Sequence, residues 1–128
     1  MSRSVLDASA LMAVINREAG VDKLTPQILK NATASTVNLA EVHGKLVQNG
    51  FSPDDAWTAA NGVIHESVAF TAEQAKIAGD LVPHTRALGL SLGDRACLAL
   101  GISLRVPVFT ADRSWKNLSL SVRIHVIR

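Results

Sequence analysis

Short apolar runs alternate along this chain with longer stretches whose apolar residues recur every three or four positions. Short runs bounded by turn signals are typical of buried strands, and the longer spacing is typical of helices. The pattern predicts strands over 4–7, 32–36, 67–70, 107–109 and 122–127. It predicts helices over 10–18, 21–30, 37–48, 53–64, 72–80 and 92–104, and a connector over 84–90. This alternation favours an α/β fold, a parallel sheet with helices on both faces.

Several helix starts carry a side chain that can accept a hydrogen bond from the first turn. The expected caps are Ser9, Ser52, Thr71 and Ser91. Asp94 follows Ser91 by three residues, which resembles a capping box. Pro26 should start a turn or kink the stretch 21–30. The helix from 92 is apolar on most sides, so we expect it to be buried.

The bulk composition narrows the class of protein. A chain of 128 residues is expected to form one domain over 1–128 with a core of its own. Cys97 is the only cysteine, so no intrachain disulfide can form, and we expect it to fill the core. Asp7 interrupts any signal-peptide pattern, and no apolar run is long enough for a membrane span. A cytoplasmic location fits, and the net charge of +2 is too small to demonstrate nucleic-acid binding.

Four acids should meet at one end of the sheet. Asp7 and Asp112 leave the carboxyl ends of strands, Glu41 lies early in the helix after the second strand, and Asp94 opens the helix before the fourth. Ligands of open parallel sheets bind beyond these ends, where the strand order reverses. Converging carboxylates repel and should raise one another's pKa values. Divalent cations would reverse that repulsion, and ligands that are all oxygen suit Mg²⁺ or Mn²⁺.

Such a metal site would favour attack of water on a phosphodiester. Ser9 and Thr110 could hold the carboxylates or a bound water. Asn38 shares a helical face with Glu41 and could either orient the site or cap its helix.

Each acid also has a structural interpretation. Asp94 could only cap its helix, and Asp112 could cap a short helix over 114–117. Glu41 lies four residues before Lys45, the spacing of a surface ion pair. Asp7 is the least easily explained in this way, because a carboxylate directly after a central strand needs partners.

Basic residues flank the segments that carry acids, and they could contact phosphates. They are Arg86, Arg95, Arg113 and Lys116. Such residues more often lie on the solvated surface without a functional role. His43 and His65 are expected at the surface or core edge, and Trp57 and Trp115 in packing.

Four motifs, in order, resemble a PIN-domain ribonuclease and more narrowly the VapC-type toxins of bacterial toxin–antitoxin pairs. They are Val5-Leu-Asp7-Ala-Ser9-Ala, Asn38-Leu-Ala-Glu41-Val, Leu90-Ser-Leu-Gly-Asp94-Arg-Ala-Cys-Leu-Ala-Leu and Thr110-Ala-Asp112-Arg-Ser-Trp. The resemblance covers the whole chain and implies a three-layer fold with a five-stranded parallel sheet in the order 3-2-1-4-5. It implies catalytic Asp7, Glu41, Asp94 and Asp112, and it matches Ser9, Asn38 and Thr110 less specifically.

The resemblance also implies metal-dependent cleavage of RNA with Mg²⁺ or Mn²⁺, the metal being held by Asp7, Asp94 and Asp112. It implies a homodimer, no membrane, and a VapB-type antitoxin whose tail occupies the acidic groove and through which alone DNA is bound. We expect the dimer surface on the helices over 37–48 and 53–64, which carry more apolar residues than one sheet-facing stripe needs. The residues counted are Leu39, Val42, Leu46, Val47, Trp57, Val63 and Ile64.

Two other classes of function are open: a PIN-like domain without a mainly catalytic role, and another α/β protein with an acidic site. A PIN-like domain could serve mainly in a DNA-binding complex with its partner, with little or no catalysis. A response-regulator receiver would need an acceptor aspartate at the end of the third strand, where this chain has Val-Ala-Phe70-Thr-Ala-Glu73. An aspartyl phosphatase would need a second acid two residues after Asp7, where Ser9 stands.

Overall fold

Five parallel strands form the central sheet of the computed structural model, which describes residues 2–128. The strands are β1 (Ser4–Leu6), β2 (Ala32–Ser35), β3 (Glu66–Val68), β4 (Val108–Thr110) and β5 (Ile124–Val126). Their order is β3-β2-β1-β4-β5, and every neighbouring pair is parallel. The order reverses between β1 and β4, which confirms the predicted fold class.

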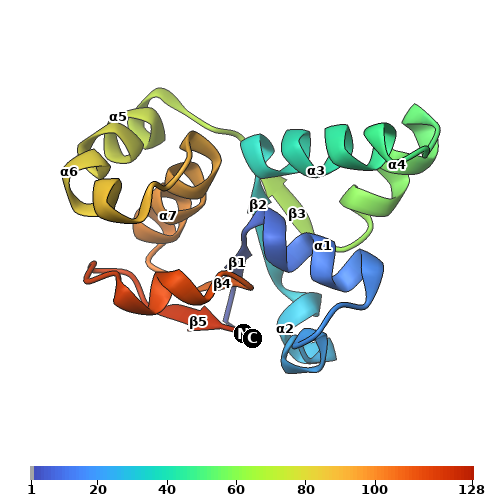
Figure 1. Ribbon diagram of the computed structural model, residues 1–128, viewed down its shortest axis with the longest axis horizontal. Helices are drawn as coiled ribbons and strands as arrows, with labels where there is room; N and C mark the ends of the chain where they lie inside the picture. The colour runs from blue at the N-terminus through green and yellow to red at the C-terminus, as the bar shows by residue number, and fades with distance from the viewer. Residues whose placement is uncertain (1) are drawn as a thin grey trace.

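Helices cover both faces of the sheet (Figure 1). On one face lie α1 (Ala8–Asn16), α2 (Pro26–Lys30), α3 (Thr36–Gln48) and α4 (Pro53–Asn61). On the other lie α5 (Ala72–Asp80), α6 (Val82–Thr85) and α7 (Leu92–Leu104). Short 3₁₀ turns complete the chain: η1 (Val21–Lys23), η2 (Arg86–Leu88) and η3 (Arg113–Asn117).

The core has two halves, one on each face of the sheet. Leu6, Leu11 and Leu39 belong to the half beneath α1, α3 and α4. Leu98 and Trp115 belong to the half beneath α7 and η3. The division follows from the pleat of β1, because successive side chains of a strand point to opposite faces of its sheet.

The buried helix α7 packs closely on the sheet. A β-carbon at Gly101 would lie 2.4 Å from a methyl carbon of Val108, so only glycine allows this approach. Cys97 is fully buried in α7, as predicted, and burial raises the pKa of its thiol well above the ordinary value. Within residues 2–128, no helix is long and apolar enough to cross a membrane.

The first helix is capped by Asp7 and not by Ser9, so that prediction was wrong. Asp7 has an extended backbone, and its carboxylate accepts a hydrogen bond from the Ala10 N–H. Because α1 begins directly after β1, Ser9 lies inside the helix. The caps Ser52, Thr71 and Ser91 are confirmed, and Ser91 forms a full capping box with Asp94.

Other boundaries also differ from the prediction, among them those of the first helix, β3 and β5. The stretch 21–30 divides into η1 and α2, because Thr25 caps a new helix with Pro26 at its first position. Helix α4 ends at Asn61, where Gly62 follows as its C-cap. The expected connector over 84–90 contains the end of α6 and all of η2.

The apolar surplus expected on α3 and α4 is mostly absent. Leu39, Val42, Leu46 and Ile64 are buried and belong to the core. Exposed apolar side chains remain at Val47, Phe51 and Trp57, of which Trp57 is 48% exposed. The exposed apolar patch available for a dimer surface at this pair of helices is therefore smaller than expected.

Candidate active site at the carboxyl ends of the strands

Asp7 is the buried centre of the site, at the carboxyl end of β1 and only 3% exposed. One of its carboxylate oxygens accepts from the Ser9 hydroxyl at 2.7 Å and from the Ala10 N–H at 2.8 Å. The other accepts from the Thr110 hydroxyl at 2.5 Å. Thr110 ends β4, the neighbour of β1 at the reversal of strand order, so the sheet itself brings this pair together.

Burial is the main influence on the ionisation of Asp7. Loss of hydration raises the pKa of its carboxyl from 3.8 to about 6, against the lowering effect of hydrogen bonds from Thr110, Ser9 and Ala10. The charge of Asp94 also raises this pKa, but it is the smallest of these causes. Repulsion between acids, expected as the main cause, is therefore secondary to desolvation.

The two hydroxyls that bind Asp7 also hold the chain that leads to Asp112. Thr110 accepts from the Asp112 N–H at 3.0 Å, and Ser9 accepts from the Ala111 N–H at 2.9 Å. Asp112 itself is exposed and caps η3, where one of its oxygens accepts from the N–H and the hydroxyl of Ser114. The capping role predicted for Asp112 is thus confirmed, and its position beside Thr110 is defined by the same network.

Glu41 is held by α3 and α7 together. The Asn38 side-chain amide donates to Glu41 at 3.0 Å and to the Gly93 carbonyl at 3.0 Å. Among residues 2–128 no ion pair joins Glu41 to Lys45. Asn38 is buried, and its Oδ1 has no partner. It orients Glu41, whereas the cap of α3 is Ser35.

Gly93 was not singled out as a site residue, although it decides where Glu41 can lie. A β-carbon at Gly93 would lie 2.1 Å from a carboxylate oxygen of Glu41. Glycine is costly inside a helix, so its presence directly before Asp94 was a signal that the sequence offered.

Asp94 opens α7 and faces the same region. One of its oxygens accepts from the Ser91 N–H at 2.9 Å, as the capping alternative predicted. Besides burial, which is the main cause, the charges of Asp7, Asp94 and Glu41 raise the pKa of the Cys97 thiol, which lies one turn further along α7. The charges of these three acids therefore all reach the first turns of α7.

The side chains of the four acids do not converge on one metal-binding position. Within the part of the chain that the structure describes, no group of three or more His, Cys, Asp or Glu side chains is placed to hold one metal ion. Asp94 and Asp112 each turn an oxygen towards a backbone N–H of their own helix. Carboxylates repel one another at close range, so hydrogen bonds to separate backbone N–H groups stabilise them.

The donor set nevertheless fits a hard divalent cation. The available ligands are carboxylate oxygens, supported by the Ser9 and Thr110 hydroxyls, and no nitrogen or sulfur ligand lies among these site residues. The unpartnered Asn38 Oδ1 is a further buried oxygen beside Glu41.

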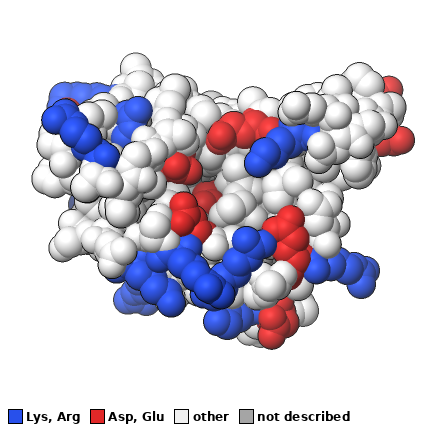
Figure 2. Space-filling model, in the orientation of Figure 1, with Lys and Arg blue, Asp and Glu red and all other residues white. Residues whose placement is uncertain are grey.

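The flanking basic residues have different surroundings. Figure 2 shows acidic side chains near the centre of this face, with lysine and arginine side chains below them. Arg113 lines a pocket with Ser9, Asp112 and Arg128. Arg95 instead donates to the Ala78 carbonyl and ties α7 to α5. Arg86 is exposed in η2, and Lys116 lines a separate cavity beside β5.

The expected packing roles are only partly seen. Trp115 is 1% exposed and packs in the core, whereas Trp57 is half exposed and contacts His43 edge to face, with ring centroids 5.7 Å apart. His65 is exposed, as expected.

The family model described as PIN domain matches residues 4–119. No curated protein matches the sequence significantly.

Several solved structures share the fold across nearly the whole chain. VapBC2 from Rickettsia felis, bound to a DNA fragment from its promoter, is 17% identical, with a TM-score of 0.73 over 96% of this chain and 97% of that chain. DNA-bound VapBC from Salmonella typhimurium is 14% identical, with a TM-score of 0.75 over 100% of both chains. The Sarcin-Ricin loop cleaving toxin VapC20 of Mycobacterium tuberculosis is 16% identical, with a TM-score of 0.69 over 91% of this chain and 96% of that chain.

Proposed function

Because the chain belongs to the PIN domain family, we propose that it is a metal-dependent endoribonuclease and the toxin of a toxin–antitoxin pair. The observation that carries the proposal is the placement of Asp7. A buried carboxylate with three hydrogen-bond donors and a raised pKa stands at the reversal of strand order, within reach of the charge of Asp94. Perturbed carboxylates in such positions are typical of catalytic sites.

Asp7, Asp94 and Asp112 would hold Mg²⁺ or Mn²⁺, with Glu41 completing the acidic site. The bound cation would supply activation of water and neutralisation of charge on the scissile phosphate. The protein's own residues prepare this site. Thr110 and Ser9 orient the Asp7 carboxylate, and Asn38 holds Glu41 against Gly93.

Contacts to the RNA backbone are proposed for Arg113, which shares a pocket with Asp112 and Ser9. Arg86 is exposed and available for a similar role. The bond from Arg95 to Ala78 favours a structural role for Arg95.

The proposed partner is a VapB-type antitoxin whose tail covers the acids, with DNA bound only through that antitoxin. The proposal is supported by fold likeness to VapBC complexes, two of which contain DNA. A homodimer that uses the patch of Val47, Phe51 and Trp57, and a single domain over 1–128, complete the proposal.

The first prediction tests catalysis through Asp94→Asn. The substitution removes a charge but keeps a side-chain oxygen for the Ser91 N–H, so the fold should be retained. Cleavage of a labelled RNA in Mg²⁺ should fall by about a hundredfold or more, a typical effect of removing a group that stabilises charge in the transition state. Loss of growth inhibition on expression should accompany it.

The matched control is Asp22→Asn, the same change on an exposed residue of η1. It should cleave like the parent. Equal cleavage by Asp94→Asn and Asp22→Asn would refute the assignment. A parent that cleaves no RNA in Mg²⁺ or Mn²⁺, yet binds promoter DNA with its partner, would favour a DNA-binding role without catalysis.

A further inference from the structure

A groove runs along the free edge of the sheet, beside β5. It is a cavity of about 480 Å³, which we call the β5 groove. Its walls include Leu118, Ile124 and Val126, and none of the four acids lines it. The groove is therefore distinct from the proposed nuclease site.

The backbone of β5 presents unpaired hydrogen-bonding groups to this groove. The Arg123 carbonyl accepts from the Val108 N–H, and the Ile127 N–H donates to the Thr110 carbonyl. In a parallel ladder only alternate residues bond to a given neighbour. The N–H and C=O groups of Ile124 and Val126 therefore point away from β4, towards the position of a sixth strand.

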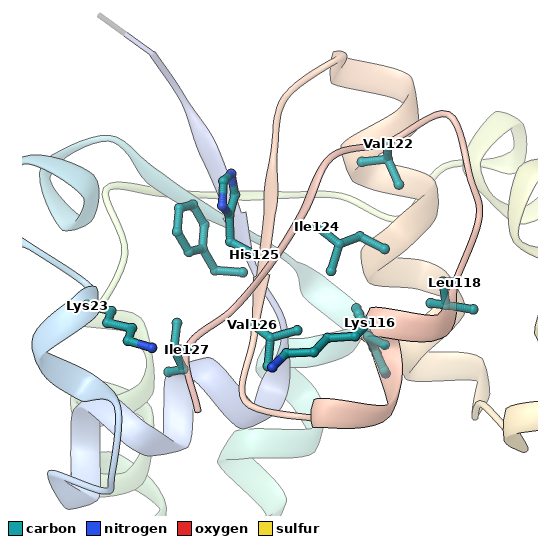
Figure 3. Close-up of a pocket in the computed structure, with 10 residues that line it drawn as sticks. Lys23, Lys116, Leu118, Val122, Ile124, His125, Val126 and Ile127 are labelled. Carbon is teal, nitrogen blue, oxygen red and sulfur yellow. The ribbon is translucent and has the colours of Figure 1, made fainter.

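The titratable side chains that line the groove are all basic. Lys23 approaches from η1 and Lys116 from η3, and Figure 3 shows them reaching towards β5 from opposite sides. His125 also lines the groove, stacked on Phe109 with ring centroids 4.8 Å apart. No aspartate or glutamate among the described residues lines it, so the groove is complementary to negative charge.

A buried donor without a partner also lines the groove. Trp115 is 1% exposed, and its indole N–H has no hydrogen-bond partner in the protein. A buried donor left unpaired is costly, and this one is closed to solvent in the structure.

We propose that β5 binds an extended acidic peptide segment, which adds to the sheet as a sixth strand. The outward N–H and C=O groups of β5 match the backbone of a peptide. The apolar walls suit its aliphatic side chains, and the two lysines suit its carboxylates. A second copy of this chain fits less well, because edge-to-edge pairing would bring the lysines of the two copies together. RNA fits less well, because a phosphate backbone offers no regular donors to the outward carbonyls.

The geometry also constrains the sequence of the segment. Successive residues of a strand point to opposite faces of the sheet. Lys116 lies in η3, on the face of the core that contains Trp115, and Lys23 lies in η1, on the face of α1. Two adjacent acidic residues would therefore reach one lysine each, and the β-branched residues beside them would cover Ile124 and Val126.

The test uses a fluorescent peptide of about eight residues, a usual strand length, with valine and threonine on either side of one adjacent glutamate pair. Binding to the full chain is measured by fluorescence anisotropy. The parent should bind, and the double variant Lys23→Glu/Lys116→Glu should bind at least about tenfold more weakly, because two favourable charge pairs become unfavourable. Both lysines are exposed, so the fold should persist, and a melting curve checks this.

Lys30→Glu is the matched control, because Lys30 is exposed in α2 and does not line the groove. It should bind the peptide like the parent. A peptide methylated on alternate backbone nitrogens should not bind, since it cannot pair with β5. Bound peptide should slow hydrogen exchange at the Ile124 and Val126 amides.

Three results would overturn the proposal. The first is a parent that does not bind the peptide, or that binds the methylated peptide equally well. The second is an RNA oligonucleotide that displaces the peptide and leaves both edge amides exchanging freely, which would assign the groove to nucleic acid. The third is protection of these amides that rises with protein concentration alone, which would assign the edge to a second copy.

Discussion

At the scale of single residues, burial changes the protonation of Asp7. Its carboxyl has a pKa of about 6 in the folded chain, against 3.8 as the ordinary value. Three hydrogen bonds favour the charged form, yet desolvation outweighs them. Burial thus makes the charged form of Asp7 more costly than in water, and a bound cation would offset that cost.

This shift predicts a pH dependence of stability in EDTA. Folded Asp7 binds a proton more tightly than unfolded Asp7. Its favourable contribution to the free energy of unfolding is therefore full below pH 3.8 and is lost as pH rises through about 6. The rise from 3.8 to about 6 corresponds to about 3 kcal/mol in the free energy of unfolding. Denaturant unfolding of parent and Asp7→Asn from pH 4 to 7 should show the parent losing stability relative to the variant. A pH-independent difference would contradict this account.

Gly93 offers a second prediction at this scale, through Gly93→Ala. The added methyl group would displace the Glu41 carboxylate from its place beside Asn38, so RNA cleavage should fall by about tenfold or more. Stability should change little or rise by up to about 1 kcal/mol, because alanine favours the helix. Cleavage rates and melting curves measure the two effects separately.

Gly44→Ala is the control for that substitution. Gly44 lies in α3 with open space around its α-carbon, so alanine should stabilise the helix and leave cleavage unchanged. If Gly93→Ala also left cleavage unchanged, Glu41 would not need its observed position.

At the scale of elements, α7 joins stability to the site through its first turn. Ser91 and Asp94 cap the helix reciprocally, and the same turn carries Gly93 and its hydrogen bond from Asn38. Fraying of this turn would therefore release Asp94 and Glu41 together.

Ser91→Ala should show that coupling. Loss of the cap should lower the free energy of unfolding by about 1 kcal/mol. Cleavage should fall too, although Ser91 carries no charge and is not among the acids. Ser52→Ala removes the equivalent cap from α4 and should cost similar stability without loss of cleavage. Equal cleavage by both variants would show that the first turn of α7 is rigid without its cap.

At the scale of the whole molecule, metal binding should be visible as stability. A ligand that binds only the folded chain stabilises it by about 2.7 kcal/mol at a hundredfold excess over its Kd. Mg²⁺ should therefore raise the melting temperature of the parent more than that of Asp94→Asn.

In EDTA, Asp94→Asn should be as stable as the parent or slightly more stable, because it removes a charge that raises the pKa of Asp7. Melting curves of both proteins, each in EDTA and in Mg²⁺, provide the comparison. A metal-free variant that melts well below the metal-free parent, with equal shifts in Mg²⁺, would mean that the acids do not form one site.

Local signals along the chain were enough for most of the architecture. The periodicities of strands and helices differ, so the alternation of elements could be predicted. The caps could be predicted too, because Ser52, Thr71 and Ser91 each accept a hydrogen bond from the N–H three residues later. The positions of Asp7 and Asp112 were readable too, because both residues follow apolar strands. These features are determined by residues that are close in sequence, so a local pattern is enough to predict them.

Other features depend on contacts between residues far apart in the chain, and only the folded arrangement decided them. Thr110 binds Asp7 across 103 positions, and Asn38 reaches Gly93 across 55. Burial was decided in the same way. It made desolvation and not repulsion the main influence on Asp7, and it placed Leu39 and Val42 in the core and not on a dimer surface. A residue's hydration depends on everything packed around it, so no local pattern contains that information.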